Sequence, residues 1–139
     1  MQINKSTKFT IIAGPCAIET EEICFEVAEK SFQLCKKFDF QYAFKASYKK
    51  ANRTSGKSFR GVGIEEGIKI LSNVKNYFKI PILTDVHSVG EVESVSKVVD
   101  IIQIPAFLSR QTELIEVVAK TGKMVNIKKG QFMSPNEIK

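Results

Sequence analysis

Short apolar runs alternate with amphipathic segments along the whole chain, and this alternation limits the possible fold more than any other feature. Each of the first four apolar runs is followed by a stretch in which apolar residues recur at helical spacing. A β/α alternation with mostly short links is typical of a parallel sheet covered by helices, so we predict an α/β fold. The predicted strands are 9–13, 42–46, 81–84, 99–103 and 124–128, and the predicted helices are 21–38, 65–78, 89–97 and 110–120.

The first predicted helix carries clear signals at its start and along one face. Thr20 is the expected N-cap, and the acids at 21 and 22 suit the positive end of the helix dipole. Six residues at helical spacing are expected on the buried face: Ile23, Cys24, Val27, Ala28, Leu34 and Cys35. Cys24 and Cys35 are therefore predicted to be core thiols. Near the other end of the chain, Ser134 and Pro135 have the pattern of a further helix start.

Composition and charge narrow the class of ligand. The chain has 139 residues, of which 43% are hydrophobic and 26% charged, which suits one globular unit with a core. Its net charge of +6 is compatible with nucleic acid, an anionic membrane or phosphorylated small molecules. The cations gather in particular loops, with few aromatic residues nearby and no nucleic-acid-binding motif. This distribution favours phosphorylated small molecules as partners, and no nucleic acid.

Three features predict the compartment. No apolar run approaches the roughly 20 residues that span a bilayer, so no membrane partner is expected. The first residues lack the apolar segment of a signal peptide. The three cysteines are an odd number, which favours free thiols over a disulfide framework. We therefore predict a reducing, cytoplasmic environment.

The segment 45–60, KASYKKANRTSGKSFR, is rich in cations and begins at the end of the second predicted strand. Arg forks bind phosphate oxygens in pairs, Lys adds a point charge, and hydroxyls and amides add neutral hydrogen bonds. The mixture indicates an anion site. From composition alone, a solvated loop on a basic protein is the more frequent interpretation. The six cations are Lys45, Lys49, Lys50, Arg53, Lys57 and Arg60.

Polar residues stand at or near the carboxyl ends of four predicted strands: Lys45, Asp85, Gln103 and Lys128. In a (β/α) barrel the active site lies at this end, and a doubly wound sheet also binds ligands at its carboxyl edge. Periodicity alone does not separate the two folds. Each residue also has a structural interpretation, such as a lysine that extends its ammonium to water or an acid that caps the next loop.

The order of residues in 45–55, KASYKKANRTS, resembles the substrate loop of the 3-deoxy-D-manno-octulosonate 8-phosphate synthase family. Further segments resemble signatures of that family and occur in the family's order. They are IAGPCAIE at 12–19, RGVGIEEG at 60–67, TDVH at 84–87, IQIPAFLSRQT at 102–112 and NIKKGQF at 126–132. Together they cover nearly the whole chain from about Phe9, and they are far more specific together than any one alone.

The resemblance implies a (β/α)8 TIM barrel, which takes about 250 residues and eight strands. Five strands are predicted here. We therefore expect residues 1–139 to be a partial TIM-barrel domain that holds about the first five β/α units, with the C-terminal part absent. Open sheet edges need covering. A homo-oligomer or a complementary C-terminal chain is the expected partner.

The family's activity is an aldol-type condensation of phosphoenolpyruvate with D-arabinose 5-phosphate. It yields 3-deoxy-D-manno-octulosonate 8-phosphate and phosphate for lipopolysaccharide precursor synthesis. By resemblance, the phosphoenolpyruvate ligands are Lys45, Lys50, Gln103 and Lys128, and the sugar-phosphate ligands are Asn52, Arg53 and Thr54. Arg110 matches an arginine that reaches the sugar phosphate of a neighbouring subunit. The residues nearest the chemistry would be Lys50, Asn52, Asp85 and His87.

Cys16 follows Gly-Pro at the end of the first predicted strand. A lone cysteine is most often a small buried hydrophobe. In the resembled family, cysteine at this position marks the metal-dependent class, so a divalent Zn, Fe or Mn is the expected cofactor. The family's other ligands are a histidine, a glutamate and an aspartate in the later part of the barrel. His87 is the only histidine here, and its family counterpart lines the site without binding metal.

Two alternatives stay open. The first is 3-deoxy-D-arabino-heptulosonate 7-phosphate synthase, a related barrel enzyme that uses erythrose 4-phosphate. Its loop typically reads Lys-Pro-Arg-Thr-Ser, whereas this chain has Ala51 and Asn52 before Arg53. The second is a catalytically incomplete barrel fragment, which at most binds phosphate-bearing ligands or pairs with a complementary chain.

Overall fold

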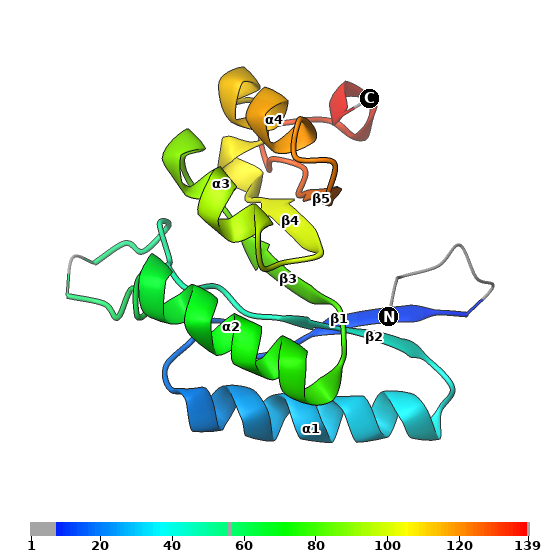
Figure 1. Ribbon diagram of the computed structural model, residues 1–139. Helices are drawn as coiled ribbons and strands as arrows, with labels where there is room; N and C mark the ends of the chain where they lie inside the picture. The colour runs from blue at the N-terminus through cyan, green and yellow to red at the C-terminus, as the bar shows by residue number, and fades with distance from the viewer. Residues whose placement is uncertain (1–7, 56, 139) are drawn as a thin grey trace.

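The structure, a computed structural model, describes residues 8–55 and 57–138. Within these residues five strands alternate with four α-helices, and two short 3-10 helices, η1 and η2, follow β4 and β5 (Figure 1). The strands are β1 (Thr10–Ala13), β2 (Gln41–Lys45), β3 (Ile82–Asp85), β4 (Ile101–Ile104) and β5 (Met124–Ile127). The helices are α1 (Glu21–Lys37), α2 (Ile64–Phe78), α3 (Val89–Ser96), η1 (Ala106–Leu108), α4 (Thr112–Ala119) and η2 (Pro135–Ile138). Every predicted strand and helix is present, with boundaries shifted by two residues at most.

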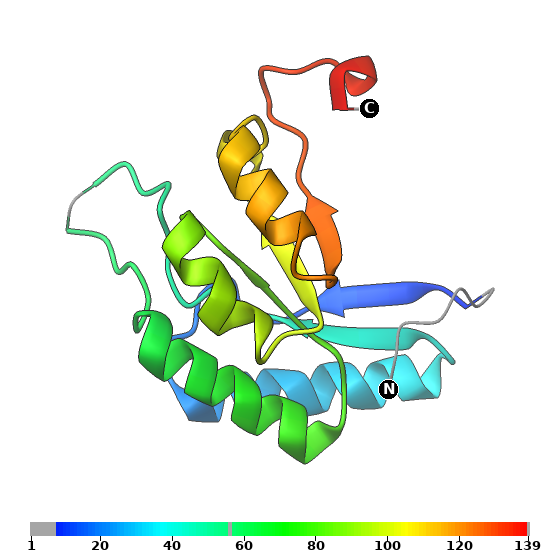
Figure 2. The ribbon, with the colours of Figure 1, turned by 45° about the horizontal axis from the view of Figure 1, so that its top comes forward.

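All five strands are parallel, and their order in the sheet is the order of the chain, β1-β2-β3-β4-β5. Figure 2 shows the sheet curling from β1 to β5 with the helices on its outer side. A doubly wound sheet reverses its strand order and carries helices on both faces. Sequential order with helices on one side is the arrangement of a (β/α) barrel. The fold is therefore a curled part-barrel of α/β class, as predicted.

Helix α1 begins where predicted, because Thr20 Oγ1 accepts the N–H of Ile23 at 3.3 Å and so caps the first turn. Cys24, Ala28 and Cys35 are buried, which confirms that both cysteines are core thiols. The prediction that Ile23 and Leu34 share this buried face is wrong, since they are 38% and 57% exposed. Within the described residues α1 packs against β2 and α2, so only a narrow stripe of the helix is covered.

The main core lies between the sheet and the helices, with Phe44, Leu71, Ile82 and Ile102 among its fully buried members. A second, smaller cluster is formed by Ala43, Leu83 and Ile101, and we call it the inner cluster. Successive residues of a strand point to opposite faces, so the inner cluster lies on the sheet face away from the helices. This concave face corresponds to the inside of a barrel.

The concave face and the two outer strands leave apolar surface and backbone groups uncovered. Ile12 on β1 is 45% exposed and Met124 on β5 is 50% exposed. Within the part of the chain that the structure describes, β1 pairs only with β2, and β5 only with β4. Each has therefore one edge with no strand partner among those residues. Such edges favour association with further strands.

No described helix combines the length and the apolar character needed to cross a lipid bilayer.

Candidate functional site

The alternation of side chains along each strand brings the polar strand ends together. Members of the inner cluster lie two residues before Lys45, Asp85 and Gln103 on β2, β3 and β4. Residues two apart share a face, so these three polar side chains also lie on the concave face. The sheet register places Asp85 opposite Gln103, and Gln103 opposite Asn126 of β5. Polar groups from four neighbouring strands thus meet at one end of the sheet.

A cavity of about 310 Å³ opens among these strand ends. It is lined by residues from β1's end to the segment after β5. Nine of the predicted site residues are among them: Cys16, Lys45, Lys50, Asn52, Arg53, Asp85, His87, Gln103 and Lys128. The sequence-based prediction that these residues share one site is therefore supported by their placement. Their individual roles stay predictions.

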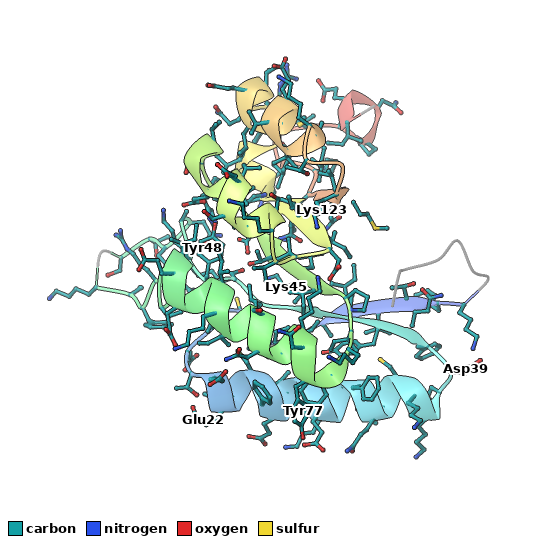
Figure 3. All side chains as sticks on the ribbon, viewed as in Figure 1. Glu22, Asp39, Lys45, Tyr48, Tyr77 and Lys123 are labelled. Carbon is teal, nitrogen blue, oxygen red and sulfur yellow. The ribbon has the colours of Figure 1, made fainter. Side chains whose placement is uncertain are left out.

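Two lysines are held together by one buried hydroxyl. Ser47 Oγ accepts from Lys45 Nζ at 3.0 Å and from Lys50 Nζ at 2.8 Å, and Ser47 is fully buried. Burial lowers the pKa of Lys45, and the charges of Lys50 and Lys128 act in the same direction, while Asp85 opposes them. Cations that crowd one another in this way are stabilised by an anion. The pair therefore brings two positive charges together in the cavity wall, where an anion would be stabilised (Lys45 is labelled in Figure 3).

Asp85 and His87 form a buried polar pair beside these lysines. His87 Nε2 lies 3.2 Å from Asp85 Oδ2, and the two side chains are only 5% and 9% exposed. Burial raises the pKa of Asp85, but hydrogen bonds from His87 and Ser47 and the charge of Lys45 outweigh it, so the pKa is lowered. Asp85 Oδ1 and His87 Nδ1 are buried without a hydrogen-bond partner among the described residues. His87 Nδ1 lies on the side of Glu91, 3.7 Å from its Oε2, whereas Asp85 belongs to the cavity wall, so its Oδ1 is the unpaired oxygen that a ligand could satisfy.

The far wall of the cavity belongs to β4 and β5. Asn126 Nδ2 donates to Gln103 Oε1 at 2.9 Å, which leaves the Gln103 NH₂ as the amide group that can donate to a ligand. The backbone N–H of Lys128 donates to Ile104 O at 3.0 Å and continues the β4–β5 pairing past the end of the strand. Lys128 is exposed and lines the cavity, so it is the third lysine of the cavity wall after Lys45 and Lys50.

The loop between β2 and α2 supplies the remaining cavity residues, Asn52 and Arg53. Its two arms are joined where the Lys50 N–H donates to Arg60 O at 2.7 Å. Gly61 has φ of 105°, and a β-carbon there would stand 2.1 Å from Tyr48 O. Only glycine permits this crossing of the arms. The side chains of Asn52 and Arg53 remain exposed, so a ligand can reach them from solvent.

Two predicted site residues lie apart from the cavity lining. Thr54 is exposed on the loop one residue beyond Arg53 and does not line the cavity. Arg110 is exposed and precedes Gln111, the N-cap of α4. Arg110 was expected in the first turn of that helix, and this is wrong because the chain first makes the turn η1. Its charge instead helps to lower the pKa of Glu137, after the hydrogen bonds from Ser134.

Several residues in or around the cavity were not singled out from the sequence, among them Ser47, Tyr48, Glu91, Asn126 and the lining residue Gln131. Ser47 and Tyr48 lie inside the cation-rich segment and are fully buried there. Glu91, on α3, accepts hydrogen bonds from both Tyr48 and the His87 backbone. The only sequence signal for Ser47 and Tyr48 is that their hydroxyls stand among several lysines of one segment. The contact with Glu91 has no local sequence signal.

The described residues alone do not provide a complete metal site. Cys16 is exposed and lines the cavity, with a free thiol. Among residues 8–55 and 57–138, no group of three or more His, Cys, Asp or Glu side chains is placed to hold a metal ion. A structural or catalytic zinc normally takes three or four protein ligands. Within the described residues Cys16 has no such partners, so a metal bound there would need further ligands from outside them.

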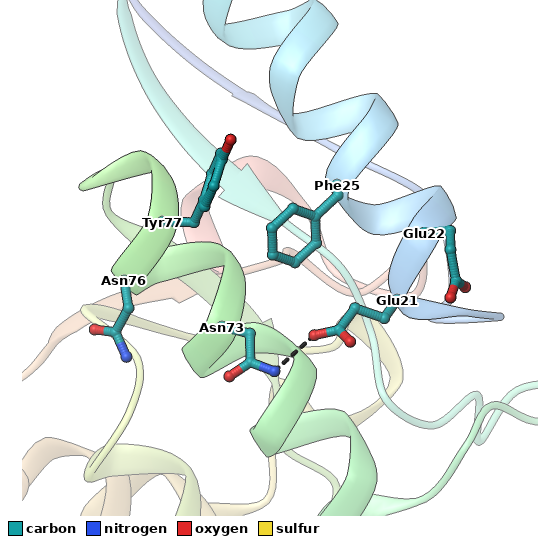
Figure 4. Close-up of a pocket in the computed structure, with 6 residues that line it drawn as sticks. All are labelled: Glu21, Glu22, Phe25, Asn73, Asn76 and Tyr77. Atoms are coloured by element: carbon teal, nitrogen blue, oxygen red, sulfur yellow. Dashed lines mark hydrogen bonds between the residues drawn. The ribbon is translucent and has the colours of Figure 1, made fainter.

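A second hollow, of about 610 Å³, lies between α1 and α2 on the helix side of the sheet. Figure 4 shows Glu21 and Asn73 joined by a hydrogen bond of 2.6 Å across it, with Phe25 and Tyr77 as its aromatic wall. It carries no cation and lies away from the strand ends. The strand-end cavity is therefore the better candidate for chemistry.

Fold and cavity define a (β/α)-barrel protein with a cation-lined anion site at the carboxyl ends of its strands. The chain belongs to the DAHP synthetase I family, whose model matches residues 1–139. This agrees with the family resemblance carried by the segment 45–55.

Relatives with established names are similar to nearly all of this chain. A 2-dehydro-3-deoxyphosphooctonate aldolase of Burkholderia cenocepacia is 49% identical over 138 residues, which are 99% of this chain and 49% of the relative. A protein of the same name from Dechloromonas aromatica is 52% identical over 131 residues, which are 94% of this chain and 47% of the relative. The chain thus spans about half the length of the curated relatives it matches.

Proposed function

We propose that this chain provides the phosphoenolpyruvate- and sugar-binding half of a barrel that makes 3-deoxy-D-manno-octulosonate 8-phosphate. One observation carries the proposal. Lys45, Lys50 and Lys128 surround the same cavity as the buried Asp85–His87 pair. The names of the relatives, which designate aldol chemistry on a phosphorylated deoxyoctonate, supply the class of substrate.

Phosphoenolpyruvate carries a carboxylate and a phosphate, and the inner part of the cavity suits both. The ammonium groups of Lys45 and Lys50 lie within 3.0 Å of one hydroxyl and so present two neighbouring positive charges. Lys128 adds a charge in the cavity wall, and Gln103 offers an amide NH₂. Charge-assisted hydrogen bonds of this kind are roughly twice as strong as neutral ones. We assign the phosphoenolpyruvate subsite to these four residues.

Arabinose 5-phosphate would bind along the β2–α2 loop. Arg53 presents the planar fork that suits a phosphate, and Thr54 adds a hydroxyl nearby on the loop. Asn52 lines the cavity and can hydrogen-bond the aldehyde or a sugar hydroxyl. Asp85 lines the cavity and its Oδ1 has no hydrogen-bond partner among the described residues, so we assign this oxygen to a sugar hydroxyl or a water. Arg110, outside the cavity, is proposed to reach the sugar phosphate of a neighbouring subunit.

The reaction joins two anions that repel each other. Carbon 3 of phosphoenolpyruvate attacks the aldehyde carbon, and the aldehyde oxygen takes a proton. Water adds at carbon 2, and the C–O bond to the phosphate breaks, which releases inorganic phosphate and leaves the new 2-keto acid. The cationic cavity holds both substrates in contact and offsets their repulsion. Asp85 and His87 are proposed to order the water and the hydroxyl next to the reacting carbons.

For the metal, we propose that Cys16 supplies one thiolate ligand for Zn, Fe or Mn, and that the other ligands lie outside the described residues. Support comes from the free thiol at the cavity wall. When bound, such an ion would polarise a substrate oxygen. No step above depends on it.

The assembly that we propose covers the open part of the barrel with further protein, either a second copy or a chain that supplies more strands. The unpaired edges of β1 and β5 and the exposure of Ile12 and Met124 support it. The proposed compartment is the cytoplasm, where both substrates and reduced thiols are available.

A second candidate is a barrel part that binds phosphorylated ligands without turnover on its own. The incomplete ligand set around Cys16 and the uncovered concave face favour it for the chain in isolation. The heptulosonate reaction is less favoured, because Ala51 and Asn52 precede Arg53 in the cavity wall and the named relatives are octonate enzymes.

The deciding experiment measures phosphate release from phosphoenolpyruvate with added zinc or manganese, with arabinose 5-phosphate and erythrose 4-phosphate offered separately. For the assembled protein we expect phosphate release when arabinose 5-phosphate is offered, and none when erythrose 4-phosphate is offered. Release only with erythrose 4-phosphate would overturn the assignment of the sugar. No release with either sugar, together with saturable binding of phosphoenolpyruvate by calorimetry, would support the binding-only candidate. Lys97→Ala, at the exposed C-cap of α3, is the control.

A further inference from the structure

Glu91 joins two loops of the cavity although it does not line the cavity. It lies in the first turn of α3, and its Oε2 accepts the His87 backbone N–H at 2.7 Å and the Tyr48 hydroxyl at 2.9 Å. The same oxygen lies 3.7 Å from His87 Nδ1, and Oε1 lies 3.4 Å from Lys49 Nζ. One carboxylate therefore contacts both the start of the β2–α2 loop and the loop after β3.

Tyr48 is the fixed point of this contact on the loop side. It is fully buried, and its ring lies edge-on to the His87 ring at 6.1 Å. The Gly63 N–H donates to Tyr48 O at 3.2 Å, so the returning arm of the loop is attached to the same residue. Figure 3 shows Tyr48 beside the N-terminal part of α2. Moving Tyr48 would therefore move both arms of the loop: the returning arm through Gly63, and the outgoing arm with Lys50 two residues after Tyr48.

The ionisation states of Glu91 and Tyr48 agree with a stable hydrogen bond between them. Burial raises the pKa of Glu91, but the hydrogen bonds from His87 and Tyr48 and the charge of Lys49 outweigh it, so the pKa is lowered. Burial, together with Glu91, raises the pKa of Tyr48 well above its usual range. Near neutral pH the hydroxyl is thus the donor and the carboxylate the acceptor.

We propose that Glu91 is a positioning residue that holds His87 and the Tyr48–Lys50 segment in one arrangement around the cavity. Through the His87 backbone it fixes the imidazole that pairs with Asp85. Through Tyr48 it keeps Lys45 and Lys50, which both donate to Ser47, in place. The proposal deepens the proposed function, because the groups that it positions are the proposed substrate ligands. Its geometry is nevertheless independent of which sugar is used.

A purely structural role makes different predictions. An acid in the first turn stabilises a helix by interacting with its dipole, typically by 0.3–1 kcal/mol. If Glu91 only stabilised α3 in this way, replacing it would lower the stability of the protein without changing the environment of the His87 imidazole. Glu93 is the matched control, since it lies on the same helix, is 81% exposed at its side chain and pairs with Lys97.

The experiment compares Glu91→Gln, Tyr48→Phe and Glu93→Gln with the unaltered chain. Because His87 is the only histidine, a ¹⁵N–¹H spectrum of the imidazole reports this one ring. Binding of inorganic phosphate is measured on the same samples by titration. We expect Glu91→Gln and Tyr48→Phe to shift or broaden the imidazole signals and to weaken phosphate binding about two- to tenfold, the range for one lost hydrogen bond. Glu93→Gln should do neither.

Imidazole signals and phosphate affinity unchanged in Glu91→Gln, with only a lower melting temperature, would overturn the positioning role. If Glu91→Gln fails to fold, Tyr48→Phe decides, because it removes a single oxygen and keeps the ring. If the sugar assignment is wrong, there will be no turnover with arabinose 5-phosphate. The variants will still differ in their imidazole signals and in their phosphate affinity. Failure of the proposed function and failure of the positioning role are thus separable.

Discussion

Gly67 on α2 lies directly against Tyr48. A β-carbon added at position 67 would stand 2.2 Å from the Tyr48 β-carbon, far inside normal contact distance. Gly67 is buried, and its backbone forms part of the second turn of α2. The helix can therefore approach the loop that carries the site only because this residue has no side chain. Position 67 links the packing of α2 to the geometry of the cavity.

We expect Gly67→Ala to destabilise the protein by about 1–3 kcal/mol, the usual cost of overpacking a filled site. In an open helix the same change stabilises by up to about 1 kcal/mol, because alanine has the higher helix propensity. Gly90→Ala on α3 is the control, since an added β-carbon there meets nothing within 4 Å. Urea unfolding of the two variants measures the difference. Equal stability of both variants would contradict the close contact with Tyr48.

Arg53→Ala is expected to raise the KM for arabinose 5-phosphate about tenfold or more in the assembled, active protein, because it removes a charge-assisted contact to phosphate. The KM for phosphoenolpyruvate should change little. Lys57→Ala on the same loop is the control, since Lys57 does not line the cavity. Steady-state kinetics with each substrate varied in turn tests this. An unchanged sugar KM would remove Arg53 from the sugar-phosphate subsite.

Because Asp85 is buried and its pKa is lowered, the free energy of unfolding should depend on pH in the acid range. Its folded pKa is lowered, so its contribution is complete above the unfolded value of about 3.9 and is lost as the pH falls through the folded value. Between pH 6 and pH 3 the free energy of unfolding should therefore fall less in Asp85→Asn than in the unaltered chain. Denaturant unfolding at both pH values gives this comparison. Parallel losses in the two proteins would show that Asp85 is not ionised in a favourable site.

Cys16→Ser is expected to weaken Zn²⁺ or Co²⁺ binding by the assembled protein and to abolish the thiolate-to-cobalt absorption band, because serine does not offer a soft ligand. Cys35→Ser serves as the control, since Cys35 is buried in α1 and burial raises its pKa. The measurement is a cobalt titration followed by absorbance, which needs no turnover. A thiolate band that survives in Cys16→Ser would place the ligand at another residue.

Much of the fold could be predicted from the sequence because its signals are local. The start of α1 depends on Thr20 and the two acids after it, all within one turn. The strands were recognised as apolar runs, and their ends shifted by two residues at most. The errors arose where burial depends on a neighbouring element. Ile23 and Leu34 fit the helical period, yet no described element covers them.

The candidate site likewise has a part that could be predicted from the sequence and a part that could not. Lys45, Asp85 and Gln103 could be placed together from the sequence, because in parallel strands the carboxyl ends share one edge and residues two apart share a face. The sharing of Ser47 by two lysines could not, because it depends on how the chain turns after β2.

The β/α order, the family signatures and the set of polar groups at the strand ends can all be recognised in the sequence. Which of these groups contact one another depends on how the elements pack in three dimensions. Tyr48 and Glu91 are 43 residues apart, and their 2.9 Å contact exists because α2 and α3 pack side by side on the curled sheet. Periodicity encodes positions within one element. The separation of two loops depends on how whole elements pack, and no local pattern records it.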